Sequence, residues 1–401
     1  VDASAPPGKN AAELPVTLVR GNVDEALRIR NEEQLPVFER LGDVREKAVT
    51  MGQIADILQA RGELDEALRI RNEEELPVYE RLGDVRGKAV TMGQIADILQ
   101  ARGQFDDALR IRQDEELPVF ERLGDVREKA VTMGKIADIL QARGQLDDAL
   151  RIRQEKQLPV YERLGDVRGK AVTMGKIADI LHARGQLDDA LRIHNEDELP
   201  IYERLGDVRE KAVAMGKIAD ILRARGQLDD ALRIRNEEEL PVYERLGDVR
   251  SQAVTMGNIA DILQARGQLD EALALHEQRL PIAQRLGDID SLAHIRYSIA
   301  ALRLQRGEHE TGGLQTIHNE LAEAFAISVE LGRADGIAAI GKLLAQVLAM
   351  AGQREQALGV LEQAEAAYAK LDNAQGLASV SELRKAIGSA GTLCAESAAA
   401  E

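Results

Sequence analysis

The fold is decided by the stretch Asp84–Leu123, DVRGKAVTMGQIADILQARGQFDDALRIRQDEELPVFERL, because the chain repeats it almost letter for letter. One glycine of this stretch recurs every 41 residues, and one proline keeps the same spacing. The glycines are Gly21, Gly62, Gly103, Gly144, Gly185, Gly226 and Gly267, and the prolines are Pro36, Pro77, Pro118, Pro159, Pro200 and Pro241. A fixed period of this length is typical of a repeat architecture, in which each copy is one supersecondary unit.

Each copy begins with a helical pattern over about residues 85–101. Its apolar residues are spaced three and four apart, which places them in one stripe along a helix. The stripe consists of Ala89, Met92, Ile95, Ala96 and Leu99. Asp84 stands where an N-cap belongs, and Gly103 is free to adopt the left-handed conformation that ends a helix. The first half of each copy is therefore predicted to be an amphipathic helix.

The second half of each copy begins near Phe105 and contains a proline, Pro118, after a polar run. Proline inside a helix removes one hydrogen bond and bends the axis, so we expect one long helix kinked near Pro118. The alternative is two short helices, with Pro118 in the first turn of the second. Neither half can bury its stripe alone, so antiparallel pairs must stack into an elongated core.

This pattern resembles the tetratricopeptide repeat (TPR). Aligned on the turn glycine, the small family positions fall on Ala55 and Ala67, and the stretch Gly62–Ala67 matches the family's Gly-x-aromatic-x-x-Ala with Leu in place of the aromatic. The large family positions fall on Met51, Ile54 and Leu58. The resemblance covers residues 22–388 and implies an all-α, TPR-like α-solenoid, a right-handed superhelix of antiparallel helix pairs.

The repeat departs from the usual TPR in three ways. It is longer than the usual repeat of roughly 34 residues. Arg71 stands where a large apolar residue is usual, and the proline lies inside the second helix rather than at its end. Longer repeats of this kind look like those of kinesin light chains, of the bacterial maltose-regulon activator, and of the sensor arms of bacterial STAND (NACHT-type) ATPases.

The repeats divide the chain into four segments. We expect a linker and a degenerate first helix over residues 1–21, and near-identical 41-residue repeats over 22–287. Divergent C-terminal repeats and a capping helix are expected over 288–388, followed by a disordered tail over 389–401. End copies diverge in repeat proteins because they expose a face that inner copies bury. The chain begins at Val1 rather than Met, which favours a piece of a larger protein.

Composition limits the partners and the compartment. The formal net charge is −17, so the chain should repel nucleic acid and anionic membranes. We find no apolar run long enough for a membrane span and no signal peptide. The only cysteine is Cys394, which excludes an intrachain disulfide and agrees with a reducing compartment. We therefore expect a cytoplasmic protein.

The motifs that could carry chemistry are incomplete. Residues 336–343 have the spacing of a phosphate-binding loop, but Leu343 replaces the Ser or Thr that would hold magnesium. His309 and Glu310 begin a metalloprotease-like string in which Gly313 stands where the second histidine is required. The remaining histidines are scattered, and no cysteine pair exists for zinc. The sequence predicts no enzyme activity, no cofactor and no metal site.

In a stack of TPR-like pairs, the first helices line a concave groove, so binding residues are sought there. The resemblance implies that Gln53, Asp56 and Gln59 and their equivalents face this groove. The predicted groove residues are Gln53, Asp56, Gln59, Gln94, Asp97, Gln100, Lys135, Asp138, Gln141, Lys176, Asp179, His182, Lys217, Asp220, Arg223 and Asp261. The alternative is that these positions are ordinary solvated surface. One carboxylate per repeat, beside a position that varies between Gln, Lys and Asn, favours a polar groove.

A column of arginines raises a separate structural question. It consists of Arg30, Arg71, Arg112, Arg153 and Arg235, with His194 in one copy. On a continuous second helix these side chains face the neighbouring pair. We predict that the stem of Arg71 packs there while its guanidinium reaches Glu74 or Glu75, three or four residues on.

The function predicted from these features is a non-catalytic protein-interaction scaffold. It is expected to bind a peptide or protein, including a long or repetitive one, because near-identical sites in register add their contributions. A role as the sensor arm of a larger bacterial signalling protein of the STAND kind rests on the family resemblance alone. The alternative is a structural self-association module, in which copies form homo-oligomers or stack end to end.

Overall fold

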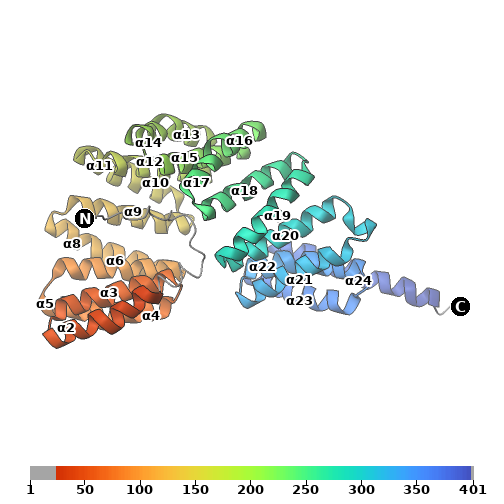
Figure 1. Cartoon of the computed structure of the whole chain (residues 1–401), viewed down its shortest axis with the longest axis horizontal. Coiled ribbons are helices and arrows are strands. Elements are labelled where there is room, and N and C mark those ends of the chain that lie inside the picture. The colour runs from red at the N-terminus through yellow and green to blue at the C-terminus, as the bar shows by residue number, and fades with distance from the viewer. Residues whose placement is uncertain (1–23, 399–401) are drawn as a thin grey trace, which may run out of the picture. The chain divides into compact units, whose positions relative to one another are not determined.

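The computed structural model describes residues 24–398, and every regular element in this range is a helix (Figure 1). The expected all-α repeat fold is thereby confirmed. The linker and degenerate first helix expected over residues 1–21 lie outside the described residues. The chain divides into two compact units, unit 1 (residues 1–227) and unit 2 (residues 228–401), and each is described by itself.

The described part of unit 1, residues 24–227, contains five first helices and the second helices that pair with them. The first helices are α3 (Val44–Ala60), α6 (Val85–Ala101), α9 (Val126–Ala142), α12 (Val167–Ala183) and α15 (Val208–Ala224). The second helices contain α2 (Leu35–Leu41), α4 (Leu64–Ile70) and α5 (Leu76–Leu82), α7 (Phe105–Arg110) and α8 (Leu117–Leu123), α10 (Leu146–Ile152) and α11 (Leu158–Leu164), and α13 (Leu187–Arg192) and α14 (Leu199–Leu205).

Every second helix of unit 1 also contains a π-helical segment directly before its proline. These segments are η1 (Ile29–Gln34), η2 (Arg71–Glu75), η3 (Ile111–Glu116), η4 (Arg153–Gln157) and η5 (Ile193–Glu198). At the end of η3 the Leu117 N–H donates to the Arg112 carbonyl, five residues back. Pro118 then lies in the first turn of α8, where its missing N–H is tolerated. The second helix is therefore neither the simple kinked α-helix that we expected nor two separate helices.

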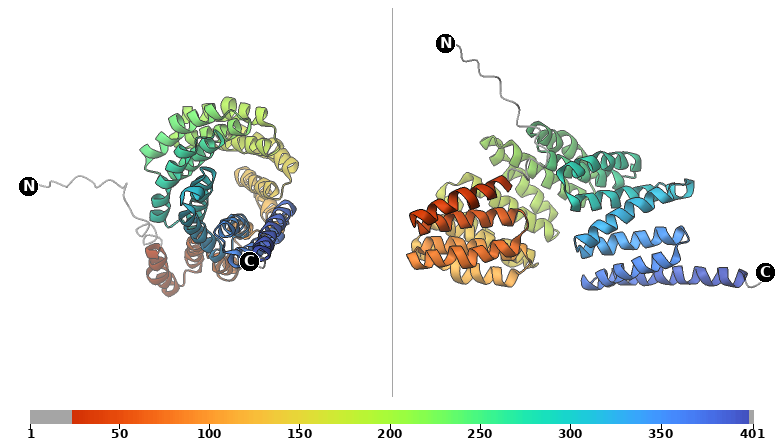
Figure 2. Two further views of the ribbon diagram at one scale, coloured as in Figure 1. Left: turned by 90° about the vertical axis from the view of Figure 1, so that its right-hand side faces the viewer. Right: turned by 60° about the horizontal axis from the view of Figure 1, so that its bottom comes forward.

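Unit 2 continues the repeat and then diverges. It contains α16 (Leu228–Ile234), η6 (Arg235–Glu239, π-helical), α17 (Leu240–Leu246), α18 (Val249–Ala265), α19 (Leu269–Leu286), α20 (Ile289–Gln305), η7 (Glu308–Thr311, a 3-10 helix), α21 (Leu314–Glu330), α22 (Ala334–Met350), α23 (Arg354–Lys370) and α24 (Ala374–Ala398). Figure 2 shows α21 to α24 as successive antiparallel helices.

The boundary between the two compact units falls between residues 227 and 228, inside the near-identical repeats. The change from near-identical to divergent repeats at 287–288 stays a prediction. The last helix, α24, continues to Ala398, whereas we expected it to end at residue 388 and a disordered tail to follow. The sequence of this extension contains no proline, and its three alanines favour a helix, although Gly391 weakens it.

Each first helix is bounded by the residues that the sequence indicated. The Asp84 carboxylate accepts a hydrogen bond of 2.8 Å from the Gly87 N–H, which caps the start of α6. Gly103, at φ +75°, follows its end in the left-handed conformation. These caps fix the length of each helix and therefore the register of its side chains.

The core of each unit is aliphatic and continuous between repeats. Ile98 of α6 is fully buried in a cluster formed by residues of α3 and α4, which belong to the preceding repeat. Ile139 of α9 occupies the same place in the next cluster along the chain. Because burying such a side chain contributes about 1.5–3 kcal/mol, each repeat depends on its neighbour for much of its stability.

Candidate binding groove of unit 1

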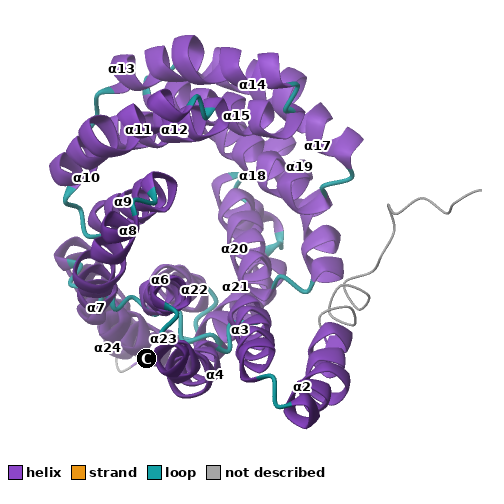
Figure 3. Cartoon of the chain, turned by 90° about the vertical axis from the view of Figure 1, so that its left-hand side faces the viewer, coloured by secondary structure: helices purple, strands orange, loops and turns teal. Residues whose placement is uncertain are grey.

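The first helices of unit 1 form its inner layer. Figure 3 shows α12 and α15 on the inner side of the arc, with α13 and α14 outside them. All predicted groove residues except Asp261 lie on these first helices, and most are half-buried; Asp261 lies on α18 of unit 2. Asp56 and Arg223 are the most exposed of them.

Five of the predicted residues line one shallow pocket of about 360 Å³. They are Gln100 of α6, Lys135, Asp138 and Gln141 of α9, and Lys176 of α12, and Ala142 completes the lining. Three successive first helices thus contribute to one cavity. The other predicted residues occupy equivalent positions along the same layer: Gln53, Asp56, Gln59, Gln94, Asp97, Asp179, His182, Lys217, Asp220 and Arg223.

The groove carboxylates hold the buried arginines of the second helices. Arg112 of η3 is only 3% exposed, and its Nη2 donates to Asp97 Oδ1 at 2.6 Å. Arg153 of η4 reaches Asp138 in the same way at 2.6 Å. Arg71 donates to Asp56. The sequence indicated that these carboxylates bind a partner in the groove. In the structure each one also accepts a hydrogen bond from a buried arginine of the second helix.

The arginine column reaches a carboxylate four residues on, as we predicted, but its other carboxylate lies on the first helix of the same pair rather than on the neighbouring pair. The second guanidinium nitrogen of Arg112, Nη1, donates to Glu116 Oε2 at 2.6 Å, four residues on. Arg71 pairs with Glu75 at 2.5 Å, so Glu75 rather than Glu74 is its carboxylate partner. Burial raises the pKa of the Glu116 carboxyl, although the neighbouring Arg112 charge acts in the opposite direction.

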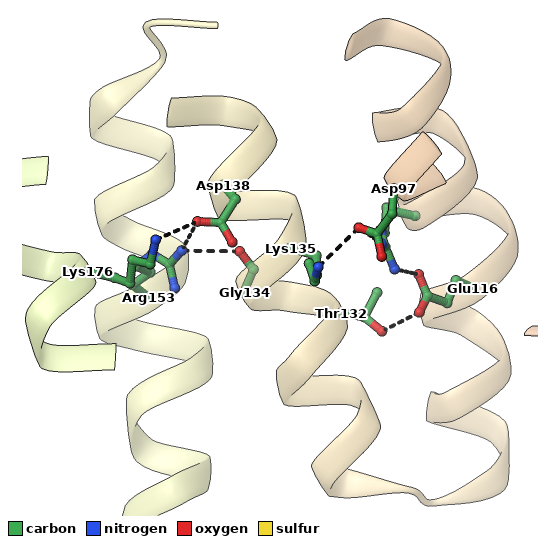
Figure 4. Close-up of polar contacts among 9 residues, drawn as sticks. Asp97, Glu116, Thr132, Gly134, Lys135, Asp138, Arg153 and Lys176 are labelled. Atoms are coloured by element: carbon green, nitrogen blue, oxygen red, sulfur yellow. Dashed lines mark hydrogen bonds and ion pairs between the residues drawn. The ribbon is translucent and has the colours of Figure 1, made fainter. Parts of the chain in front are cut away.

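Sequence reasoning missed the residues that make room for this pair. A Cβ atom added at Gly93 would lie 2.7 Å from Glu116 Oε1 and 2.8 Å from Arg112 Nη1. Thr132 of the next first helix donates to Glu116 Oε1 at 3.1 Å (Figure 4). The signal was present in the sequence, because a glycine recurs in the middle of a helix where it weakens helix formation.

Lysines of the groove bridge consecutive repeats. Lys135 of α9 donates to Asp97 of α6 at 3.1 Å (Figure 4), and Lys217 of α15 lies 3.1 Å from Asp179 of α12. The predicted Lys and Asp columns are therefore partners of each other. Two cations, Arg112 and Lys135, face two carboxylates, Asp97 and Glu116, so the polar network around η3 is electrically balanced.

A row of exposed valines makes the groove less polar than we expected. Val90, Val131, Val172 and Val213 are between 38% and 45% exposed. Each lies four residues before the groove Gln or Lys and seven before the groove Asp, and therefore on the same helix face. The regular spacing of these valines was visible in the sequence, but we predicted only the polar residues beside them as groove residues.

The incomplete catalytic motifs lie in helices. Residues 336–343 form part of α22, and His309 belongs to the short helix η7. Among the described residues, no three His, Cys, Asp or Glu side chains are placed to hold a metal ion. Within residues 24–398, no helix combines the length and apolarity needed to cross a membrane.

Residues 251–311 match the tetratricopeptide repeat family. No curated protein sequence matches the chain. Among solved structures, the chain is similar to a STAND protein with a tetratricopeptide repeat sensor from Pyrococcus horikoshii, with a TM-score of 0.58 and 15% identity. That match covers 93% of this chain and 55% of the other, so the chain spans about half the length of that protein.

Two further similar structures are matched over nearly their whole length. The quorum sensor NprR from B. thuringiensis, in its apo form, matches 87% of this chain and 98% of its own length, with a TM-score of 0.55 and 14% identity. The apo form of RapI matches 71% of this chain and 99% of its own, with a TM-score of 0.51 and 13% identity. At these identities the likeness establishes the fold alone.

Proposed function

We propose that the chain is a non-catalytic interaction scaffold whose unit-1 groove binds an extended peptide segment, since it has a TPR-like repeat fold and residues 251–311 match the tetratricopeptide repeat family. The observation that carries the proposal is the exposed valine row, which runs beside the ion-paired Lys and Asp columns on α6, α9, α12 and α15. Exposed apolar side chains arranged in a row are typical of binding surfaces.

The repetition of the groove supports a long or repetitive partner. Each copy offers one valine, one carboxylate and one Gln or Lys, so consecutive segments of a partner meet similar contacts. Contacts that are individually weak add up when they are linked in one chain. The net charge of −17 supports a partner other than nucleic acid or an anionic membrane.

A random dodecapeptide library displayed on phage, panned against the purified chain, tests this function. Peptides selected from it should lose affinity by about tenfold or more in the double variant Val131→Ser, Val172→Ser, since each valine contributes roughly 1 kcal/mol of buried apolar surface. The matched control is Leu82→Ser, Leu123→Ser, which removes two leucines of similar exposure, 47% and 49%, outside the groove. Equal loss in both variants, or in neither, would contradict the proposal.

Self-association is a second candidate, favoured by those same leucines. Leu82, Leu123, Leu164 and Leu205 end the second helices of successive repeats and are 45–49% exposed, which gives unit 1 a row of apolar side chains away from the groove valines. Sedimentation velocity at several concentrations tests this candidate. Reversible oligomers that the Leu82→Ser, Leu123→Ser variant abolishes would support it, and a monomer at every concentration would exclude it.

The parent protein and its compartment belong to the same proposal. The fold likeness to a STAND protein that carries a tetratricopeptide repeat sensor supports a role as the sensor part of a larger cytoplasmic signalling protein. Identifying the coding sequence adjacent to this segment would test that role directly.

A further inference from the structure

Three successive polar networks lie behind the groove of unit 1, and they differ in charge. The network around η3 contains Arg112 and Lys135 as cations and Asp97 and Glu116 as carboxylates, and it is balanced. The Thr132 hydroxyl completes the shell of Glu116. This balanced network around η3 is the standard with which we compare the network of the next copy along the chain.

The network around η4 lacks one carboxylate, because Gln157 stands where η3 has Glu116. Arg153 Nη1 donates to the Gln157 amide oxygen at 2.8 Å, and Arg153 Nη2 donates to the Gly134 carbonyl at 3.3 Å. Two neutral acceptors thus take the place of one charged acceptor. Arg153 and Lys176 are ion-paired with a single carboxylate, Asp138 (Figure 4). The charge of Asp179 also acts on Arg153, but Asp179 is paired with Lys217 of the next network. The pairs of the η4 network thus have one surplus positive charge.

The lysine of this network is held less closely than its equivalents. Lys176 Nζ lies 3.9 Å from Asp138 Oδ1, beyond hydrogen-bond distance, whereas Lys135 lies 3.1 Å from Asp97. Asp138 already accepts the shorter, charge-assisted bond from Arg153. The Lys176 ammonium therefore retains donor capacity toward the groove, where it lines the 360 Å³ pocket.

The other groups of this pocket suit an anion. Gln100 and Gln141 offer amide N–H donors, and Lys135 of α9, which also pairs with Asp97, adds a second ammonium. The next network along the chain keeps both carboxylates: a histidine, His194, replaces the arginine beside Glu198, and Lys217 faces Asp179. Among these three networks, only the one around η4 has an amide in place of its second carboxylate, and its Lys176 and Asp138 line the pocket between α6, α9 and α12.

We propose that this pocket is a subsite for a carboxylate side chain of the peptide that occupies the groove. The proposal rests on the proposed function and adds the partner's chemistry at one point: a Glu or Asp residue that meets Lys176 and Lys135. Such a carboxylate replaces the missing charge of Gln157, and it fixes the register of the partner on an array of otherwise similar repeats.

The overall negative charge does not oppose this binding at short range. The most exposed carboxylates, such as Asp106 and Asp147 at 87% and 86% side-chain exposure, lie on second helices, one helix layer away from the pocket. Each also pairs with an arginine of the following repeat. Charges separated by more than about 8 Å are largely screened at physiological ionic strength.

Fluorescence anisotropy with two labelled peptides, octaglutamate and octaglutamine, tests the proposal on the full chain. Octaglutamate should bind about tenfold more tightly, because one charge-assisted contact contributes roughly 1.5 kcal/mol or more. Gln157→Glu should remove most of this preference, since it restores the balanced arrangement seen at Glu116. Lys176→Gln should have the same effect. Lys170→Gln, which removes a lysine paired with Glu162 on the outer edge, should leave the preference intact.

Equal affinity for the two peptides, or a preference that survives both Gln157→Glu and Lys176→Gln, would overturn the carboxylate subsite. Gln157→Glu recreates a pair that other copies contain, so its fold is checked simply by unchanged helicity and unfolding midpoint. The proposed function fails separately: if peptides selected from the library ignore the Val131→Ser, Val172→Ser variant, the groove itself is wrong. If those peptides need the valines but not Lys176, only the subsite is wrong.

Discussion

Two copies of the second helix follow one another in unit 2 and differ in length by one residue. The first runs over Leu228–Leu246 as α16, η6 and α17, with a π-helical segment of 5 residues in its middle. The second is α19, Leu269–Leu286, which is α-helical throughout. Both contain the proline, as Pro241 and Pro281. The copy that is one residue shorter is the one that is a regular helix.

The comparison shows that the extra residue, and not the proline, produces the π-helical segment. An additional residue in a helix of fixed ends is absorbed as a turn with hydrogen bonds to the fifth residue back. In η6 the Leu240 N–H donates to the Arg235 carbonyl in this way. We expected the proline to interrupt the regular helix. Pro281 nevertheless lies inside the continuous α-helix α19, whose residues pack in the core of unit 2.

The extra residue also changes what the helix buries. In η6, Arg235 pairs with Glu239 at 2.5 Å, and both are at most 5% exposed. In α19 the equivalent positions hold His276 and Arg279, and Arg279 Nη1 donates to His276 Nδ1 at 2.9 Å. A buried ion pair is thus replaced by a buried cation next to a neutral ring. This difference leads to four expectations, the largest effect first.

Removing the arginine of η6 should have the largest effect. Arg235→Met leaves the Glu239 carboxylate buried without its cation, and breaking such a pair destabilises by about 3–5 kcal/mol. Hydrogen exchange of unit 2 would locate the loss, because repeat proteins open locally as well as globally. Arg233→Met, on the same helix but half-exposed, is the control and should change stability by less than about 1 kcal/mol.

The fold could be predicted further than the site. The period, the caps such as Asp84 and the apolar stripe are local signals, and they were sufficient for the repeat architecture and for the buried position of Arg71. The π-helical segments could not be predicted, because their hydrogen-bond pattern depends on how the helix ends are held by neighbours. The loss of one residue before Pro281 was visible in the sequence, but its effect required the structure.

The candidate groove was predicted in part. Its residues lie on one layer, as the resemblance implied, and Lys135, Asp138 and Lys176 meet in one pocket. What the sequence could not show is that Asp138 is engaged from behind by Arg153, since the two residues belong to different helices. Whether this surface binds a partner stays a prediction.

Acid should weaken unit 2 through the shorter helix. Burial and the Arg279 charge lower the pKa of His276 to about 3, from an ordinary value of 6.5. Below pH 6.5 the unfolded chain binds a proton at His276 that the folded chain does not bind. The free energy of unfolding is therefore highest above pH 6.5 and decreases as the pH falls toward 3. At pH 5 the loss should be about 2 kcal/mol.

Denaturant midpoints of unit 2 measured between pH 5 and pH 7.5 would check this loss. The variant His276→Gln should lose the pH dependence in that interval, because ordinary carboxyl groups titrate mostly below it. A slope that is the same in wild type and variant would contradict the assignment to His276.

Replacing the glycine beside each buried arginine, Gly93 beside Arg112 and Gly257 beside Arg279, should lower the free energy of unfolding by a smaller amount, and by different amounts at the two sites. Gly93→Ala gains roughly 1 kcal/mol of helix propensity but pushes on Glu116 and Arg112, at a cost of about 1–3 kcal/mol for overpacking. Gly257→Ala meets only the Arg279 guanidinium, at 2.5–2.7 Å. We expect net destabilisation of about 1 kcal/mol at Gly93 and less at Gly257. Gly359→Ala in α23 is the control, because a Cβ atom added there meets nothing within 4 Å and only the gain in helix propensity remains.

Converting α19 into a copy of η6 should change structure more than stability. The change inserts one Asn after His276 and combines it with His276→Arg and Arg279→Glu. The inserted residue should appear as a π-helical segment, and the new Arg and Glu should pair as in η6. Gly257 of α18 makes room for the new pair, as Gly93 does for its own pair. Ile295 of α20, however, stands where Thr255 donates to Glu239 in the preceding repeat. The new Glu therefore lacks one hydrogen bond, and the free energy of unfolding should change by about 1 kcal/mol. A crystal structure would show the segment directly.

If the insertion alone, without the two substitutions, gave the same segment at equal stability, backbone length would be the sole cause. If the segment failed to form even with the pair present, the extra residue could not be its origin, and the proline would have to be considered again.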